Sequence, residues 1–223
     1  MPISSVHPLP YHADPGAYFA RLRHAPGAVL LDSGRPGAER GRYDILSAWP
    51  LAVLAPGRDE SANDFLARLR QGLHSLGPAT LPAGYELPFV GGLLGYMAYD
   101  FGRRLESMTN PAIDDLGLAD AHLGLYAWAV ISDHQRGTSQ LVCHPRLPAT
   151  ERERLLSLLQ QPAPDTRPAF RLLARFNADT PRERYQQAIA AIQAYILAGD
   201  CYQVNFAQRF RAPCQGDPWT AYR

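Results

Sequence analysis

The sequence predicts an α+β fold in which antiparallel β-sheets are flanked by peripheral helices. Three apolar runs between residues 28 and 57 are joined by connections too short for the crossover helix of a parallel sheet. Residues 121–144 contain two strand-like runs that meet in the stretch DHQRG, a pattern typical of a β-hairpin. Stretches with apolar residues at helical spacing separate these runs, so both kinds of secondary structure are expected.

The first part of the chain predicts a helix followed by strands. Residues 14–22 read as a helix with Pro15 at its first position, where proline is favoured. Residues 28–33 read as a buried strand, and residues 43–47 and 51–57 as two further strands. Because the connections are short, we expect these three strands to form an antiparallel meander.

A second helix and a glycine-interrupted strand follow. Residues 61–77 carry leucines at helical spacing and end at a glycine, and a loop comes next. Gly91, Gly92 and Gly95 then interrupt an apolar run, but they lack the spacing of a dinucleotide-binding fingerprint. The chain has no lysine, so a phosphate-binding P-loop is excluded. These glycines predict a bulge or a close approach of two backbones.

The last part of the chain predicts a linker, a capped helix and a strand. After a short helix at 151–160, the proline-rich residues 161–168 are the best linker in the sequence. Thr180 predicts a capping box at the start of a helix that Gly199 ends. Residues 202–210 then read as a strand that lacks most of its sheet partners, which predicts an exposed apolar edge and a disordered C-terminus or aggregation.

We therefore predict two domains, 1–165 and an incomplete second domain at 166–223.

Composition excludes several classes of function. A net charge of +1 gives no long-range attraction to nucleic acid or to an anionic membrane, and no apolar run is long enough for a membrane helix. All 22 cationic residues are arginine, so no lysine nucleophile or Schiff base can form. Cys143, Cys201 and Cys214 lack metal-ligand spacing, which favours reduced thiols in a cytoplasmic protein and no metal site.

Ser132, Asp133 and His134 are the residue types of a catalytic triad, but they are adjacent in the sequence. A triad needs its members to converge in space, whereas neighbours in a hairpin turn diverge. We interpret them as turn residues.

A more promising cluster lies where two predicted strands meet. Ser33 ends one strand, and Arg40, Arg42 and Tyr43 begin the next. A hydroxyl, two guanidinium groups and an aromatic ring could together hold a zwitterion, with an arginine or backbone groups binding its carboxylate. The alternative is a charged hairpin tip in water, and composition alone favours this alternative.

Three separated motifs carry a resemblance to a known family. The motifs GDCYQVNFAQRF, PFVGGLLGYMAYDFGRRLES and LYAWAVISDHQ resemble the large subunit (component I) of aminodeoxychorismate synthase, a relative of anthranilate synthase component I. The form DCYQVN and the ending GRRLES favour the aminodeoxychorismate branch. The resemblance covers essentially the whole chain, but members are roughly twice as long, so it implies an N-terminal portion.

The resemblance implies a reaction and its partners. It implies amination of chorismate to 4-amino-4-deoxychorismate for folate and p-aminobenzoate biosynthesis, with ammonia from a separate glutamine amidotransferase subunit. The Mg²⁺ ligands and the lysine nucleophile of the family would lie beyond Arg223, so we expect no catalytic residue in this chain and no activity from it alone. The anthranilate branch, or a non-catalytic module that binds tryptophan or docks the amidotransferase, remains an alternative.

The resemblance also implies that L-tryptophan binds at the cluster described above. Ser33 matches the serine of a family leucine-rich stretch, and Arg40, Gly41, Arg42 and Tyr43 match the other half of that pocket. The family often has an aromatic residue in place of Arg40 and a small polar residue in place of Gly41, and these departures weaken the predicted pocket.

Overall fold

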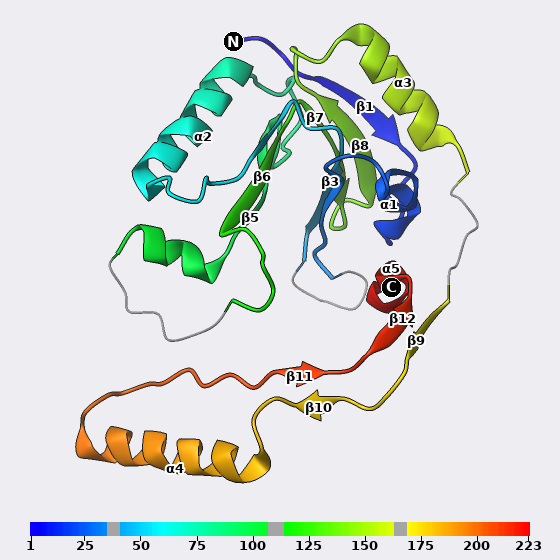
Figure 1. Cartoon of the computed structure of the whole chain (residues 1–223). Coiled ribbons are helices and arrows are strands. Elements are labelled where there is room, and N and C mark those ends of the chain that lie inside the picture. The colour runs from blue at the N-terminus through cyan, green and yellow to red at the C-terminus, as the bar shows by residue number, and fades with distance from the viewer. Residues whose placement is uncertain (35–40, 107–113, 163–168) are drawn as a thin grey trace. The chain divides into compact units, whose positions relative to one another are not determined.

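The computed structural model describes residues 1–34, 41–106, 114–162 and 169–223. It divides into two compact units, Met1–Pro164 and Asp165–Arg223. The elements are antiparallel sheets with helices packed beside them, which confirms the predicted α+β fold class (Figure 1).

A five-stranded antiparallel sheet forms the centre of the first unit, in the order β1-β8-β7-β3-β2. Its members are β1 (Ser5–Leu9), β2 (Val29–Leu31), β3 (Tyr43–Ser47), β7 (Trp128–Asp133) and β8 (Thr138–Cys143). The predicted hairpin is confirmed, since β7 and β8 pair along their whole length. The prediction that residues 28–33 form a buried strand is wrong, because β2 is an edge strand in which Leu31 is exposed.

A second sheet has the order β4-β6-β5, with β4 (Ala52–Leu54), β5 (Gly92–Met97) and β6 (Ala121–Tyr126). The predicted three-strand meander is therefore wrong, because β4 pairs with β6 and not with β3. The local cause is the segment between them: Trp49 has a φ of 50° and is followed by Pro50, so the chain cannot continue along the first sheet. Only Ala127 separates β6 from β7, so one chain segment links both sheets.

Helices cover these sheets on defined faces. Helices α1 (Gly16–Leu22) and α3 (Ala149–Gln160) bury Leu22 and Leu155 in one cluster with the five-stranded sheet. Helix α2 (Ala62–Leu76) buries Phe65 against the second sheet, close to Phe101 of the 3₁₀ helix η1 (Tyr99–Arg104). The Ser61 hydroxyl caps α2, and Gly77 follows its last turn; the sequence predicts the stop at Gly77.

Gly95 confirms that the glycines of β5 allow a close approach of two backbones. Its φ is 152°, and a Cβ atom there would overlap the carbonyl oxygen of His122 and lie 2.8 Å from the Cα of Leu123. β5 can therefore pair with β6 only because position 95 has no side chain.

The second unit consists of short elements around one long helix. They are β9 (Phe170–Leu172), β10 (Asn177–Ala178), α4 (Arg182–Ala198), β11 (Phe210–Arg211), β12 (Cys214–Gly216) and α5 (Pro218–Tyr222). Strand β12 pairs with β9, and β10 pairs with β11. Gly199 ends α4 in the left-handed conformation with a φ of 83°, as predicted.

Two predictions for this unit are wrong. The capping box does not form, because α4 has no side-chain cap; Thr180 instead exchanges two hydrogen bonds with the amide of Gln208. Residues 202–209 are not a strand, since only β11 pairs in this region. A strand needs a neighbour to accept its backbone hydrogen bonds, and the described residues supply one only at β10.

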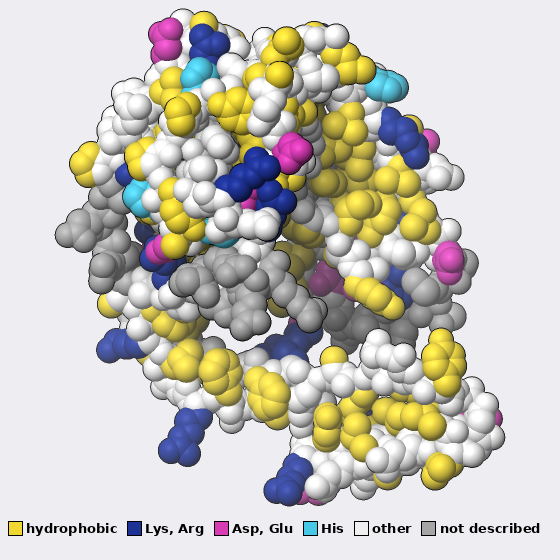
Figure 2. Space-filling view, turned by 180° about the vertical axis from the view of Figure 1, so that it is seen from behind, with side chains coloured by type: hydrophobic (Ala, Val, Ile, Leu, Met, Phe, Trp, Pro, Cys, Tyr) yellow, Lys and Arg dark blue, Asp and Glu magenta, His cyan; other side chains and the backbone are white. Residues whose placement is uncertain are grey.

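The second unit exposes many apolar side chains. Helix α4 has no buried residue, and Figure 2 shows hydrophobic side chains gathered over the segment that carries it, at the lower right. Leu197 is 88% exposed and Tyr202 is 93% exposed. Among the described residues, no helix is both long enough and apolar enough to cross a membrane.

Candidate functional site

The predicted ligand cluster lies where β2 ends and β3 begins. Ser33 is two residues beyond β2, and Gly41 is two residues before β3. The two are in close contact: a Cβ atom at Gly41 would lie 2.5 Å from the Ser33 Cβ and 2.6 Å from its Oγ. The structure thus brings Ser33 and Gly41 together, whereas Arg40 lies outside the described residues.

The hydroxyl of Ser33 is buried without a hydrogen-bond partner among the described residues. Buried polar atoms in folded proteins nearly always have a partner, and a hydroxyl can both donate and accept. An unsatisfied hydroxyl beside a glycine is therefore a feature that a polar ligand could complete.

Arg42 does not point its charge at this hydroxyl. Its guanidinium forms a fork with Asp133, with Nη2 2.9 Å from Oδ2 and Nε 3.2 Å from Oδ1. Burial would raise the pKa of Asp133, but hydrogen bonds from Arg42 and from the backbone N–H groups of Arg136 and Gln135 outweigh it and hold that pKa below its usual value. The hydrogen bond to Asp133 likewise raises the pKa of Arg42.

Tyr43 contacts Arg42 and the hydrophobic core of the sheet. Its ring packs beside the cluster of Ala129, Ile131 and Val142, on the face of the sheet opposite to Leu46. The Arg42 guanidinium carbon lies 4.6 Å from the centre of the Tyr43 ring, a cation–π contact. The structure therefore brings Arg42 into contact with Tyr43, and Ser33 into contact with Gly41.

A buried Asp–His pair supports the site formed by Ser33 and Gly41, here called the Ser33 corner. The sequence alone did not indicate this pair. Asp44 is 1% exposed; its Oδ1 accepts a 2.7 Å hydrogen bond from the Ser33 backbone N–H, and its Oδ2 lies 2.6 Å from the His134 Nε2. The other ring nitrogen of His134 lies 2.9 Å from the Tyr11 hydroxyl. The one available signal was a charged residue inside the apolar strand pattern of residues 43–47.

Ser132, Asp133 and His134 diverge, in agreement with the interpretation of this motif as a turn. Ser132 bonds Ser139 across the hairpin at 2.8 Å, while Asp133 binds Arg42 and His134 binds Asp44. No nucleophile–base–acid relay can form from these three side chains.

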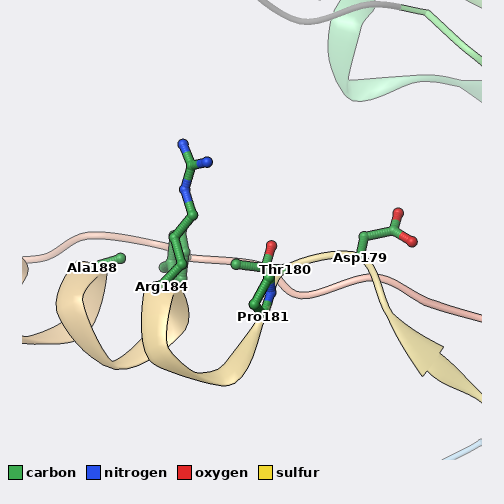
Figure 3. Close-up of a pocket in the computed structure, with 6 residues that line it drawn as sticks. Asp179, Thr180, Pro181, Arg184 and Ala188 are labelled. Carbon is green, nitrogen blue, oxygen red and sulfur yellow. The ribbon is translucent and has the colours of Figure 1, made fainter.

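The described residues also line hollows elsewhere, among them two at helix ends. One, of about 410 Å³, is at the start of α4, where Arg184 extends away from the helix and Asp179 lies on the far side of Thr180 and Pro181 (Figure 3). Asp179 is bound there by Arg211 at 2.8 Å. The other, of about 500 Å³, lies at the end of α2 near His74. Neither contains a residue that the sequence predicted to bind a ligand.

The described residues contain no group of three or more His, Cys, Asp or Glu side chains that could hold a metal ion. Divalent cations such as Mg²⁺ are held mainly by carboxylate oxygens together with substrate phosphates or water. The described part of this chain therefore does not fit a protein-built Mg²⁺ site.

The fold has a counterpart among solved structures. Anthranilate synthase component I from Streptococcus pneumoniae superposes with a TM-score of 0.62 at 22% sequence identity, covering 87% of this chain and 46% of that one. The likeness places this chain among proteins with the anthranilate synthase component I fold.

Sequence comparison identifies the family. The model for chorismate binding enzyme matches residues 28–223, so the chain belongs to the chorismate-binding enzyme family. It is 37% identical to aminodeoxychorismate synthase component 1 of Salmonella typhimurium over 98% of this chain and 49% of that protein. It is 28% identical to anthranilate synthase alpha subunit 2, chloroplastic, of Arabidopsis thaliana, over 90% of this chain and 39% of that protein. The chain thus spans about half, or less, of the length of these relatives.

Proposed function

We propose that residues 1–223 are the N-terminal portion of an aminodeoxychorismate synthase component I, which aminates chorismate to 4-amino-4-deoxychorismate for folate biosynthesis. The observation that carries the proposal is the higher identity to the aminodeoxychorismate relative, 37% against 28% for the anthranilate relative. The form DCYQVN and the ending GRRLES, which favour this branch, point the same way.

The proposal assigns the chemistry to residues beyond this chain. The chain has no lysine, so a covalent lysine intermediate cannot form on it, and its described residues offer no Mg²⁺ site. Ammonia would come from a glutamine amidotransferase subunit, because the similar protein is named as component 1. The proposed location is the cytoplasm, where free thiols such as Cys143 stay reduced.

The test is an assay with two polypeptides. The 223-residue chain, given chorismate, ammonia and Mg²⁺, should yield no product, and a polypeptide extended to the length of the relatives should yield 4-amino-4-deoxychorismate. Turnover by the short chain would contradict its proposed inactivity. Anthranilate as the product of the longer chain would move the protein to the anthranilate branch.

A second proposal concerns the Ser33 corner: it binds L-tryptophan. The buried, unsatisfied hydroxyl of Ser33 beside Gly41 supports it, since an amino acid can supply the missing hydrogen bond. Calorimetry should show tryptophan binding to the chain and at least tenfold weaker binding to Ser33→Ala. Equal affinity of the two, or no binding by either, would refute the site.

A further inference from the structure

We propose that Asp44, held in place by His134 and Tyr11, is the positioning residue that fixes Ser33 for its ligand. The inference rests on the proposed tryptophan site, but its geometric part can be measured without any ligand. Neither the resemblance nor the comparisons assign a role to these three residues.

The first argument is that Ser33 has no sheet partner to hold it. Strand β2 pairs with β3 only from Val29 to Leu31, so the backbone at position 33 lies beyond the last ladder position. The 2.7 Å bond from its N–H group to the Asp44 Oδ1 replaces the missing ladder bond. A carboxylate acceptor makes this hydrogen bond stronger than one between neutral groups.

The second argument is that Asp44 itself is immobilised. Its side chain is 1% exposed, and it lies in β3 opposite Ser132 of β7, inside the sheet. A buried carboxylate cannot rotate away from its donors without a large desolvation cost. Its second oxygen is 2.6 Å from the His134 Nε2, so both oxygens are bound.

The third argument is that His134 is fixed from three sides. Its backbone N–H donates to the Arg42 carbonyl at 2.8 Å, its Nε2 meets Asp44, and its Nδ1 meets the Tyr11 hydroxyl at 2.9 Å. The Tyr11 ring also packs edge-on against the imidazole. The chain of contacts therefore runs from the segment after β1, through the β7–β8 turn and β3, to Ser33.

Arg42, the other described residue that could bind a ligand carboxylate, is already occupied. Arg42 is the described cation nearest in sequence to Gly41, but its guanidinium is bound to the buried Asp133. A ligand at this corner therefore meets the Ser33 hydroxyl, and the orientation of that hydroxyl depends on the backbone that Asp44 holds. Asp44 touches no ligand in this scheme, so it is a positioning residue.

The test measures the Ser33 amide directly. In the wild-type chain, hydrogen exchange followed by NMR should show a protected Ser33 amide although it lies outside the strand. Asp44→Asn and His134→Ala should each lower this protection at least tenfold, and His134→Gln, which can still donate to Asp44, should restore part of it. Tyr11→Phe should have a smaller effect in the same direction, and Tyr85→Phe serves as its control because both tyrosines are 38% exposed.

Tryptophan calorimetry on the same variants separates the two proposals. We expect the dissociation constant to rise in parallel with the loss of Ser33 protection, while the protection of core amides in β7 stays within twofold. An unprotected Ser33 amide in the wild type, or an equal loss of protection at Ser33 and across β7, would overturn the positioning role. If the wild type binds no tryptophan but Ser33 protection falls as expected, the ligand assignment fails and the positioning of Ser33 stands. Should Asp44→Asn not fold, the His134 and Tyr11 variants still decide.

Discussion

A single added methyl group at Gly41 should distort the Ser33 corner. In Gly41→Ala the new Cβ would lie 2.5 Å from the Ser33 Cβ and 2.6 Å from its Oγ, and it would also overlap the Ser33 carbonyl oxygen. Carbon and oxygen atoms that are not bonded do not approach so closely, so Ser33 must move. The steric overlap by itself makes the substitution unfavourable.

The magnitude follows from the atoms involved. Extra methyl groups in a packed site typically cost about 1–3 kcal/mol, and here only one of the three overlapping atoms, the Ser33 Oγ, can rotate away, because the backbone fixes the Cβ and the carbonyl oxygen. We expect a loss at the upper end of that range, about 3 kcal/mol. If the displaced Ser33 also leaves the position in which it binds the ligand, the binding free energy falls by the same amount. Because about 1.4 kcal/mol corresponds to a factor of ten, the affinity for the ligand would be more than tenfold weaker.

The assay compares stability and affinity in the same preparation. Exchange of buried amides in β7 reports the unfolding free energy of the first unit by itself, so the second unit does not obscure the result. Gly117→Ala is the control: Gly117 has a φ of 60° and no atom within 4 Å of an added Cβ. It should lose about 1–2 kcal/mol through backbone conformation alone, with no change in tryptophan affinity.

The pattern of the two variants decides the outcome. Gly41→Ala should lose both stability and affinity, and Gly117→Ala only stability. If Gly41→Ala kept wild-type stability, the contact between Ser33 and Gly41 would be wrong. If it lost stability but kept its affinity for tryptophan, the ligand would have to bind elsewhere.

Three further outcomes follow from other parts of the first unit and from one exposed thiol of the second. Burial raises the pKa of the Cys143 thiol to about 11, so a thiol reagent at pH 8 should label the exposed Cys214 and reach Cys143 only after unfolding, as peptide mass spectrometry can show. Burial lowers the pKa of His144 below its ordinary 6.5, against the opposing hydrogen bond to Gly77, so the unfolded chain binds this proton first as the pH falls. Stability should therefore decline below about pH 6.5, and denaturation curves of His144→Gln should show a smaller decline. Gly95→Ala would push β5 off β6 and should lower the unfolding free energy by about 3 kcal/mol or more. Gly72→Ala inside α2 should raise the unfolding free energy by about 0.5–1 kcal/mol. Equal denaturation midpoints for the two variants would contradict the close approach of the strands.

Elements with local signals could be predicted from the sequence, and elements that depend on distant partners could not. Helix α2 carries its own start and stop, the Ser61 cap and Gly77, and the β7–β8 hairpin carries its turn. Strand β4 looks like any short apolar run, and its partner β6 lies about 70 residues further along the chain. No local sequence feature reveals that pairing, so the sequence predicts a meander of neighbouring strands instead.

The candidate site likewise combines features that the local sequence predicts with features that depend on distant partners. The sequence placed Ser33 and Gly41 at one sheet end, because strand order and a short turn suffice for that. It could not anticipate that Asp44 would meet His134, 90 residues away, or that Arg42 would bind Asp133, 91 residues away. Such pairs depend on which strands become neighbours in the sheet, and β3 and β7 are far apart in the sequence.

Two buried carboxylates at one sheet end explain why the guanidinium of Arg42 is not available to a ligand. Asp44 and Asp133 are each 1% exposed, and they face Ser132 and Tyr43 across the β3–β7 pair. Each carboxylate needs a compensating partner, since an unpaired buried charge is strongly destabilising. Arg42 serves one and His134 the other, so neither is free to bind the carboxylate of an amino acid. Arg42→Ala should therefore act through folding stability, and Ser33→Ala through ligand affinity, because the Arg42 guanidinium is already bound to Asp133, whereas the described residues leave the Ser33 hydroxyl unsatisfied.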